Sequence, residues 1–290
     1  SNIGGATTLI GDPPNIMIGS AAGIDFMSFA YHMTPEIIIT MVVAIVLFKF
    51  MFRKDLKQKP ENLEMLQALD EKKEIKDPTL LKKASIVLGA VIIMFMLHGM
   101  LDLDVSIIAL GGAAVLLVIT GIQPFKALHH VEWPTLLFFC GLFIIVGGVE
   151  VSGALELLAH NILELTGGDL GATMFSITIV SAFASAFVDN IPFTATMIPI
   201  VESISVDPTF AQNLTAFDYN PLWYALAFGA DLGGNGTLIG ASANLVAIAV
   251  AERFGYRIFF REFLIKGLPL MIITTMVAFG AFYLRVMFFP

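Results

Sequence analysis

Apolar segments long enough to cross a membrane recur along the whole chain. A spanning helix needs about 20 mostly apolar residues, and here hydrophobic residues make up 57% of the chain while charged residues make up 14%. The apolar segments cover residues 36–52, 84–100, 105–120, 134–148, 171–188, 222–251 and 268–289. Their apolar residues are continuous and do not alternate with polar ones, which predicts helices and excludes the strands of an outer-membrane barrel. We therefore expect an all-α polytopic membrane protein in which some spans are interrupted.

Lys and Arg are distributed unevenly among the loops. Nine of the 16 lie from Arg53 to Lys83, and four more lie from Arg253 to Lys266. Because cytoplasmic loops are enriched in these residues, both segments are expected inside the cell and the C-terminus outside. This predicts an integral protein of a bacterial or archaeal cell membrane, with residues 53–83 as a cytoplasmic connector. Within that connector we expect an amphipathic helix that ends at Asp77 and Pro78.

One apolar segment is interrupted by a polar turn. The run that ends at Val188 is followed by Asp-Asn-Ile-Pro and resumes at Phe193. Pro192 removes a backbone donor and is expected to end the helix. A carboxylate and free backbone groups at membrane depth are tolerated only where protein or water satisfies them. We therefore expect a re-entrant hairpin at about 171–201, entered from the outer side, whose tip faces a cavity.

The chain contains an internal repeat. NIGGATTLIGDPPNI at 2–16 matches DLGGNGTLIGASANL at 231–245 without a gap, and seven of these 15 positions are identical. Glycines could serve close helix packing, but packing does not explain the repeated Thr and Asn. Paired, Gly-interrupted segments instead predict two broken helices of an inverted-repeat transporter. We assign 1–52 to the end of a first repeat and 84–290 to a second repeat, and we expect the first repeat to be N-terminally truncated.

Three segments resemble a known superfamily. SNIGGATTLIGDPPNIMIGSAAG, DNIPFTATMIP and GGNGTLIGASANLVA are similar to segments of the ion-transporter superfamily, in the ArsB/NhaD branch of arsenite permeases, sodium/proton antiporters and the melanosomal P protein. Citrate transporter-like symporters are more distant relatives. The resemblance implies a homodimer with a scaffold domain and a transport domain. It also implies cation sites where a hairpin tip meets the broken helix of the same repeat.

The resemblance assigns candidate substrate- and ion-binding residues by position. In the second repeat these are Asp189, Asn190, Thr194, Asp231, Gly236, Thr237 and Asn244, and in the first repeat they are Thr7, Thr8, Gly11, Asp12 and Asn15. A sodium ion would use Asp189, Asn190, Thr237 and Asn244 as ligands. The hairpin reads Asp-Asn-Ile where the symporters have Ser-Asn-Thr, which favours a protonatable site.

Acidic residues at the helix breaks are the expected proton carriers. Asp189 and Asp231 lie at breaks inside apolar runs, where burial favours the neutral acid. Asp12 either caps a half-helix or belongs to the ion path.

These features predict a secondary active transporter that works by alternating access. We expect coupling to protons or sodium and a small anion or arsenite as substrate, with a sodium/proton antiporter as the alternative. Cys140 is the only cysteine, which excludes capture of arsenite by three thiolates of one chain. We expect no enzyme activity, no cofactor beyond a bound Na⁺ or proton, and no nucleic-acid partner. A soluble ATPase subunit docked on 53–83 and an intramembrane aspartyl protease with Asp189 and Asp231 as its dyad are remote alternatives.

Overall fold

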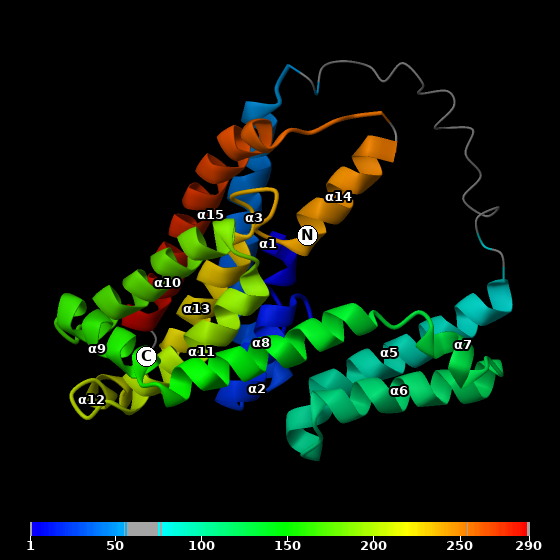
Figure 1. Ribbon diagram of the computed structural model, residues 1–290, viewed down its shortest axis with the longest axis horizontal. Coiled ribbons are helices and arrows are strands. Elements are labelled where there is room, and N and C mark those ends of the chain that lie inside the picture. Colours follow the sequence, from blue (N-terminus) through cyan, green and yellow to red (C-terminus); the bar gives the residue numbers. More distant parts are fainter. Residues whose placement is uncertain (1, 55, 57–74, 76, 254, 289–290) are drawn as a thin grey trace. The chain divides into compact units, whose positions relative to one another are not determined.

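The computed structural model describes residues 2–54, 56, 75, 77–253 and 255–288, and every regular element in these ranges is helical (Figure 1). The helices are α1 (Asn2–Gly5), α2 (Pro13–Ala22), α3 (Phe26–Met51), α5 (Pro78–Leu101), α6 (Val105–Thr120), α7 (Pro124–Leu128), α8 (Trp133–Val151), α9 (Ala154–Thr166), α10 (Leu170–Phe187), α11 (Asn190–Val206), α12 (Ala211–Leu214), α13 (Pro221–Gly233), α14 (Ser242–Arg253) and α15 (Phe260–Phe288). The all-α prediction is confirmed.

Five of these helices are long and apolar enough to cross a membrane. They are α3, α5, α8, α10 and α15, and the shorter α6 is also apolar. Their outward side chains include large apolar residues such as Val118 and Ile144, which are 81% and 76% exposed. Water does not favour so much exposed apolar surface, whereas lipid does. The chain is therefore a polytopic membrane protein, as the apolar segments predict.

The described residues form two compact units. The first contains residues 1–24, 28–47 and 138–290, and the second contains residues 25–27 and 48–137. Both copies of the repeated motif, at 2–16 and 231–245, lie in the first unit. Most of the predicted connector at 53–83, including its amphipathic helix, lies outside the described residues.

In the second unit, α5 and α6 pack against each other. The connector was predicted to run to residue 83, but α5 already begins at Pro78. Asp77 accepts hydrogen bonds from the backbone N–H groups of Thr79 and Leu80, and proline is favoured in a first helical turn, where no donor is needed. Asp77 and Pro78 therefore start α5, and the amphipathic helix predicted before them lies outside the described residues.

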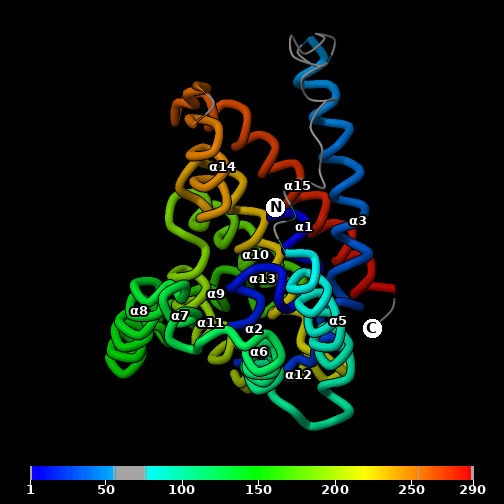
Figure 2. Tube along the Cα trace, turned by 90° about the vertical axis from the view of Figure 1, so that its right-hand side faces the viewer, coloured from blue at the N-terminus to red at the C-terminus, as the bar shows by residue number. Residues whose placement is uncertain are grey.

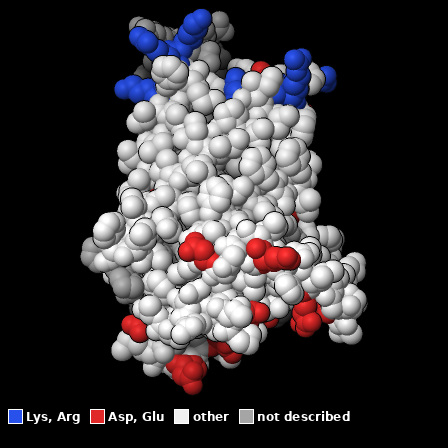
Figure 3. Space-filling model, turned by 90° about the vertical axis from the view of Figure 1, so that its left-hand side faces the viewer, with Lys and Arg blue, Asp and Glu red and all other residues white. Residues whose placement is uncertain are grey.

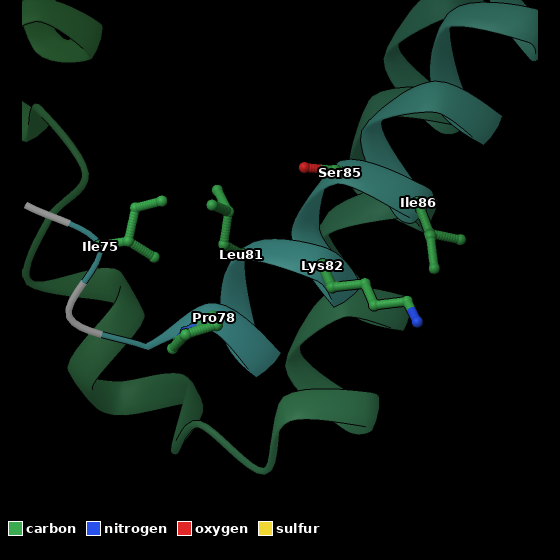
Figure 4. Close-up of a pocket in the computed structure, with 6 residues that line it drawn as sticks. All are labelled: Ile75, Pro78, Leu81, Lys82, Ser85 and Ile86. Carbon is green, nitrogen blue, oxygen red and sulfur yellow. The ribbon is translucent and has the colours of Figure 1, made fainter. Parts of the chain in front are cut away.

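A shallow apolar depression lies where α5 begins (Figure 4). Its volume is about 700 Å³, and it is lined by Ile75, Pro78, Leu81, Lys82, Ser85 and Ile86. None of the predicted site residues belongs to it.

In the first unit, α13 is the central helix, and both views show it among its neighbours (Figures 1 and 2). All its residues are buried, and it packs against α10, α15, α11, α2 and α1. Gly229 and Gly233 make the contact with α10 possible, because a Cβ atom on either would lie 2.5 Å from a backbone oxygen of α10. Thr178 of α10 adds a hydrogen bond to the carbonyl oxygen of Ala225 at 3.1 Å.

Both predicted helix breaks are present. The second falls between Gly233, where α13 ends, and Ser242, where α14 begins. The first falls between Gly5 and Pro13, which is the same stretch of the repeat. The prediction of a discontinuous helix at 222–251 is confirmed, and the observed outer ends are Pro221 and Arg253.

Two spanning helices begin earlier than predicted. The spans predicted at 36–52 and 268–289 are α3 and α15, which start at Phe26 and Phe260 and contain Pro35 and Pro269. Both prolines lie inside these helices, although proline normally breaks a helix. In α3 the carbonyl oxygen that Pro35 leaves without a helical donor accepts a hydrogen bond from Arg285 instead.

Charged side chains are segregated on the face that Figure 3 shows. On the face shown, Lys and Arg gather at the end where α15 begins, and Asp and Glu occupy the opposite half, with an apolar band between them. Arg253, Arg257, Arg261 and Lys266 lie in the α14–α15 region, and Glu156, Glu164, Asp169, Asp207 and Asp218 lie around α9 and α12. An apolar band between two charged ends suits a molecule that spans a bilayer.

Candidate functional site

The first break is closed by an amide side chain. Asn15 is fully buried in α2 and donates from Nδ2 to the carbonyl oxygens of Gly5 at 3.3 Å and Thr8 at 3.2 Å. A broken helix leaves carbonyl groups without helical partners, and the Asn15 amide satisfies two of them. Asn15 therefore stabilises the break itself.

The second break has the same arrangement. Asn244 donates from Nδ2 to the carbonyl oxygens of Gly234 at 2.7 Å and Thr237 at 2.9 Å. The acceptors are the residues that align with Gly5 and Thr8 in the repeat. The sequence repeat therefore encodes a repeated loop geometry, and this explains why Asn recurs in it.

Glycines allow each break to fold back on itself. A Cβ atom on Gly11 would lie 2.1 Å from the carbonyl oxygen of Gly5, and one on Gly240 would lie 2.9 Å from that of Gly234. Real Cβ atoms do not approach backbone oxygens so closely, so only glycine fits. Gly11 was predicted as a ligand, but here it allows the close backbone contact with Gly5 because it has no side chain.

The second break packs against the end of α10, beside the hairpin turn. Thr237 donates its hydroxyl hydrogen to the carbonyl oxygen of Ala186, and Ser185 donates to that of Ala230 at 2.6 Å. A Cβ atom on Gly236 would lie 2.7 Å from that of Ala186. The second break therefore packs against the last turn of α10, and its contact with the hairpin tip at 189–192 stays a prediction.

The hairpin turn is shorter than predicted. Only Val188 and Asp189 separate α10 from α11, and α11 continues to Val206 and not to residue 201. Pro192 was expected to end a helix, but it lies in the first turn of α11, where no backbone donor is needed. Asp189 is the N-cap of that turn, and its carboxylate accepts the N–H of Ile191 at 3.1 Å. The hairpin folds back so that its outer ends, next to α9 and α12, lie together (Figure 1).

Two side-chain hydrogen bonds link the region of the first break to the hairpin and to the second break. Asn190, which begins α11, donates from Nδ2 to Oδ2 of Asp12 in the first break at 3.0 Å. Asn2 of α1 donates from Nδ2 to Oδ1 of Asn244 at 3.5 Å. Asp12 stands at the N-cap position of α2, but its side chain makes no capping hydrogen bond there. The carboxylate of Asp12 therefore serves the contact between repeats.

Asp231 is the most deeply buried acid of the site. Its side chain is fully buried in α13, and neither carboxyl oxygen has a hydrogen-bond partner among the described residues. The carboxyl group of Asp12 and the amide of Asn15 are the side chains that interact with it, and Asp12 in turn interacts with Asp189. A fully buried acid inside a membrane-spanning segment is a candidate functional residue.

Two of the three remaining threonines that were predicted as ligands donate to backbone carbonyl groups three or four residues earlier in the chain. Thr7 donates to the carbonyl oxygen of Gly4 at 2.6 Å, and the buried Thr194 donates to that of Asn190 at 2.7 Å. Thr8 contributes its carbonyl oxygen, as an acceptor for Asn15.

The four residues predicted to bind sodium do not form an oxygen cage in this conformation. Asn190 is bonded to Asp12, and Asp189 caps α11. Thr237 and Asn244 are bonded within and beside the second break. Sodium prefers several oxygen ligands directed at one point, and these side chains are directed at different protein groups. The sodium site therefore stays a prediction.

Asn2 is a polar residue of the site that was not predicted. Its signal was present, because Asn2 aligns with Asp231 in the repeat. Ser185 was also missed, and no repeated pattern marks it.

Comparisons with known proteins show the family to which the chain is similar. The family described as citrate transporter, CitMHS, matches residues 1–229. An uncharacterized transporter of Mycobacterium tuberculosis is 42% identical over 289 residues, which is 100% of this chain and 66% of the relative. The 46 kDa membrane protein of Mycobacterium leprae is 42% identical over 98% of this chain and 65% of its own length.

The human P protein is 35% identical over 99% of this chain and 42% of its own length. The chain thus spans 66% of the length of the first of these relatives. The family's description and the names of the mycobacterial relatives include the word transporter, and the superfamily resemblance of the sequence motifs is confirmed. The chain belongs to the citrate transporter family.

Proposed function

We propose that the protein is a proton-coupled secondary transporter that moves a small anion by alternating access. The observation that carries this proposal is the hydrogen bond of Asn190 to Asp12, which joins the hairpin to the break of the other repeat. Polar and ionisable groups are costly to bury inside a membrane protein, so they are retained mostly at functional sites. Its neighbour Asp231 is buried without hydrogen bonds.

Asp231 is the proposed proton-binding residue. As a neutral acid it can stay buried in α13, and as a carboxylate it requires water or a donor. Exchange of the proton is therefore coupled to opening of the contact around α13. One elementary charge that moves through 100 mV of membrane potential is worth about 2.3 kcal/mol, so one proton per cycle already drives useful accumulation.

The substrate class is proposed from the family. Its description names citrate, so a small carboxylate anion is the first candidate and arsenite, as a neutral polyhydroxy species, is the second. We propose residues 53–83 and the α14–α15 loop on the cytoplasmic side and the C-terminus outside, from the distribution of Lys and Arg. The homodimer implied by the superfamily resemblance stays a prediction.

Two other candidate functions fit the geometry less well. A sodium/proton antiporter would need a sodium site, and the four predicted ligands are bonded to protein groups. An aspartyl protease would need Asp189 and Asp231 as a dyad, but the Asp189 carboxylate caps α11, where it accepts the N–H of Ile191.

The test is uptake into proteoliposomes that contain the purified protein. Labelled citrate and labelled arsenite are supplied separately, with either an imposed pH gradient or an imposed sodium gradient. We expect citrate accumulation with the pH gradient and none with the sodium gradient alone. Accumulation driven only by sodium would contradict proton coupling, and sodium efflux driven by protons without citrate uptake would favour the antiporter.

A further inference from the structure

Pro35 leaves a carbonyl group of α3 without its helical donor. In a regular helix the N–H of residue 35 would bond to the carbonyl oxygen of Tyr31, but proline has no N–H. Arg285 of α15 supplies the donor, because its Nη1 lies 2.9 Å from the Tyr31 oxygen. A contact between two residues 254 positions apart thus replaces a bond within one helix.

The same guanidinium group makes two further contacts with this turn of α3. Its Nη1 lies 3.2 Å from Oε1 of Glu36, and its Cζ lies 4.5 Å from the centre of the Tyr31 ring. Glu36 is only 3% exposed, and its second oxygen has no hydrogen-bond partner in the described part of the chain. Arg285 is therefore required both to neutralise Glu36 and to complete the helix at Pro35. A lysine is a point charge and lacks the planar fork that serves several acceptors together.

The turn that Arg285 completes also contacts the first break. Thr34, the residue before Pro35, donates its hydroxyl hydrogen to the carbonyl oxygen of Thr7 at 3.3 Å. Thr7 lies in the break that provides Asp12 and Asn15. The direction of the Thr34 side chain depends on the backbone at Pro35, which Arg285 fixes.

We propose that Arg285 is a positioning residue of the transport site, acting through the Pro35 turn and Thr34 on the first break. It lies outside the set of residues at the breaks and hairpin, and it does not contact them directly. A purely structural role would only fasten α15 to α3 and would not require Thr34. The importance of this contact for transport rests on the proposed function, but its effect on the break does not.

The test is amide hydrogen exchange of residues 6–12, measured by mass spectrometry on the purified protein without substrate. We expect Arg285→Lys and Thr34→Val each to accelerate exchange in this segment by about fivefold, the factor that corresponds to the loss of one neutral hydrogen bond. Thr40→Val is the matched control, because the Thr40 hydroxyl bonds only to the carbonyl oxygen of Glu36 in its own helix, at 2.8 Å. It should leave exchange at 6–12 unchanged. Acceleration by Thr34→Val alone would overturn the role of Arg285.

Double variants separate positioning from a general loss of stability. If Arg285 acts through Thr34, Arg285→Lys adds no further acceleration in the Thr34→Val background, whereas two independent effects would multiply. Pro35→Ala restores an N–H at residue 35 that can donate to the carbonyl oxygen of Tyr31. Arg285→Lys should therefore have a smaller effect in that background. Equal factors with and without Pro35 would contradict the proposal. The Pro35→Ala background also keeps the test available should Arg285→Lys alone fail to fold.

Citrate uptake and amide exchange test different claims, so together they separate this inference from the proposed function. Failure of the wild-type protein to take up citrate would count against the proposed substrate and leave the exchange results in force. Unchanged amide exchange in Arg285→Lys would contradict the positioning role of Arg285 and would leave the proposed transport function in force.

Discussion

At the scale of single residues, the contact between Asn190 and Asp12 is the feature that distinguishes this interior from ordinary helix packing. The two residues are 178 positions apart and belong to different repeats. Each of them was predicted as part of a site, but in separate sites of their own repeats. The pairing could not be predicted from the sequence, because it depends on how α11 and α2 pack, and no local pattern encodes that.

The first prediction concerns this pair. Asn190→Ala and Asp12→Ala should each destabilise the protein in detergent, and the double variant should cost less than the sum of the two. The coupling free energy should be about 1.5–3 kcal/mol, as for a hydrogen bond to a charged group. A double-mutant cycle on the free energy of unfolding measures it. Asn213→Ala is the control, because Asn213 bonds to the carbonyl oxygen of Gly168 at a distant exposed site, and its cost should add to that of Asp12→Ala.

At the scale of elements, the two helix breaks are the best predicted part of the structure. The repeated Gly, Thr and Asn predicted them, and the structure explains each residue type, with glycine for the close backbone approach and Asn244 for the free carbonyl groups. The starts of α3 and α15 were predicted less well. Proline is a local signal to break a helix, and a distant side chain, Arg285, overrides it in α3.

The second prediction tests the geometry of the first break. Gly11→Ala should lower stability by about 1–3 kcal/mol or prevent folding, because its Cβ atom would overlap the carbonyl oxygen of Gly5. Gly280→Ala in α15 is the matched control, since a Cβ atom there would meet nothing within 4 Å. Thermal unfolding in detergent compares the two variants. Equal stability of both would show that the break does not close as described.

At the scale of the whole molecule, the all-α membrane architecture followed from the length of the apolar runs. Orientation in the membrane rests on Lys and Arg, and it is a proposal that labelling can check. The sole cysteine, Cys140, is exposed, so a Cys140→Ala background is needed.

In that background, a cysteine at Arg257 should react with a membrane-impermeant thiol reagent only from the cytoplasmic side, because Arg257 lies in the basic loop before α15. A cysteine at Gln212 in α12 should react only from the outside. Labelling of both positions from the same side would contradict the proposed topology.

The central claim is that Asp231 carries the coupling proton. Asn2 occupies the equivalent position of the first repeat and bonds to Asn244 through its amide, so an asparagine at position 231 should be accommodated without loss of folding. The most direct measurement is citrate transport by Asp231→Asn in proteoliposomes, with Asp218→Asn at an exposed position as the control. The account predicts that uptake driven by a pH gradient is abolished in Asp231→Asn while exchange of internal for external citrate continues, and that the control behaves like the wild type. Uptake by Asp231→Asn that still follows the pH gradient at the wild-type rate would contradict the account.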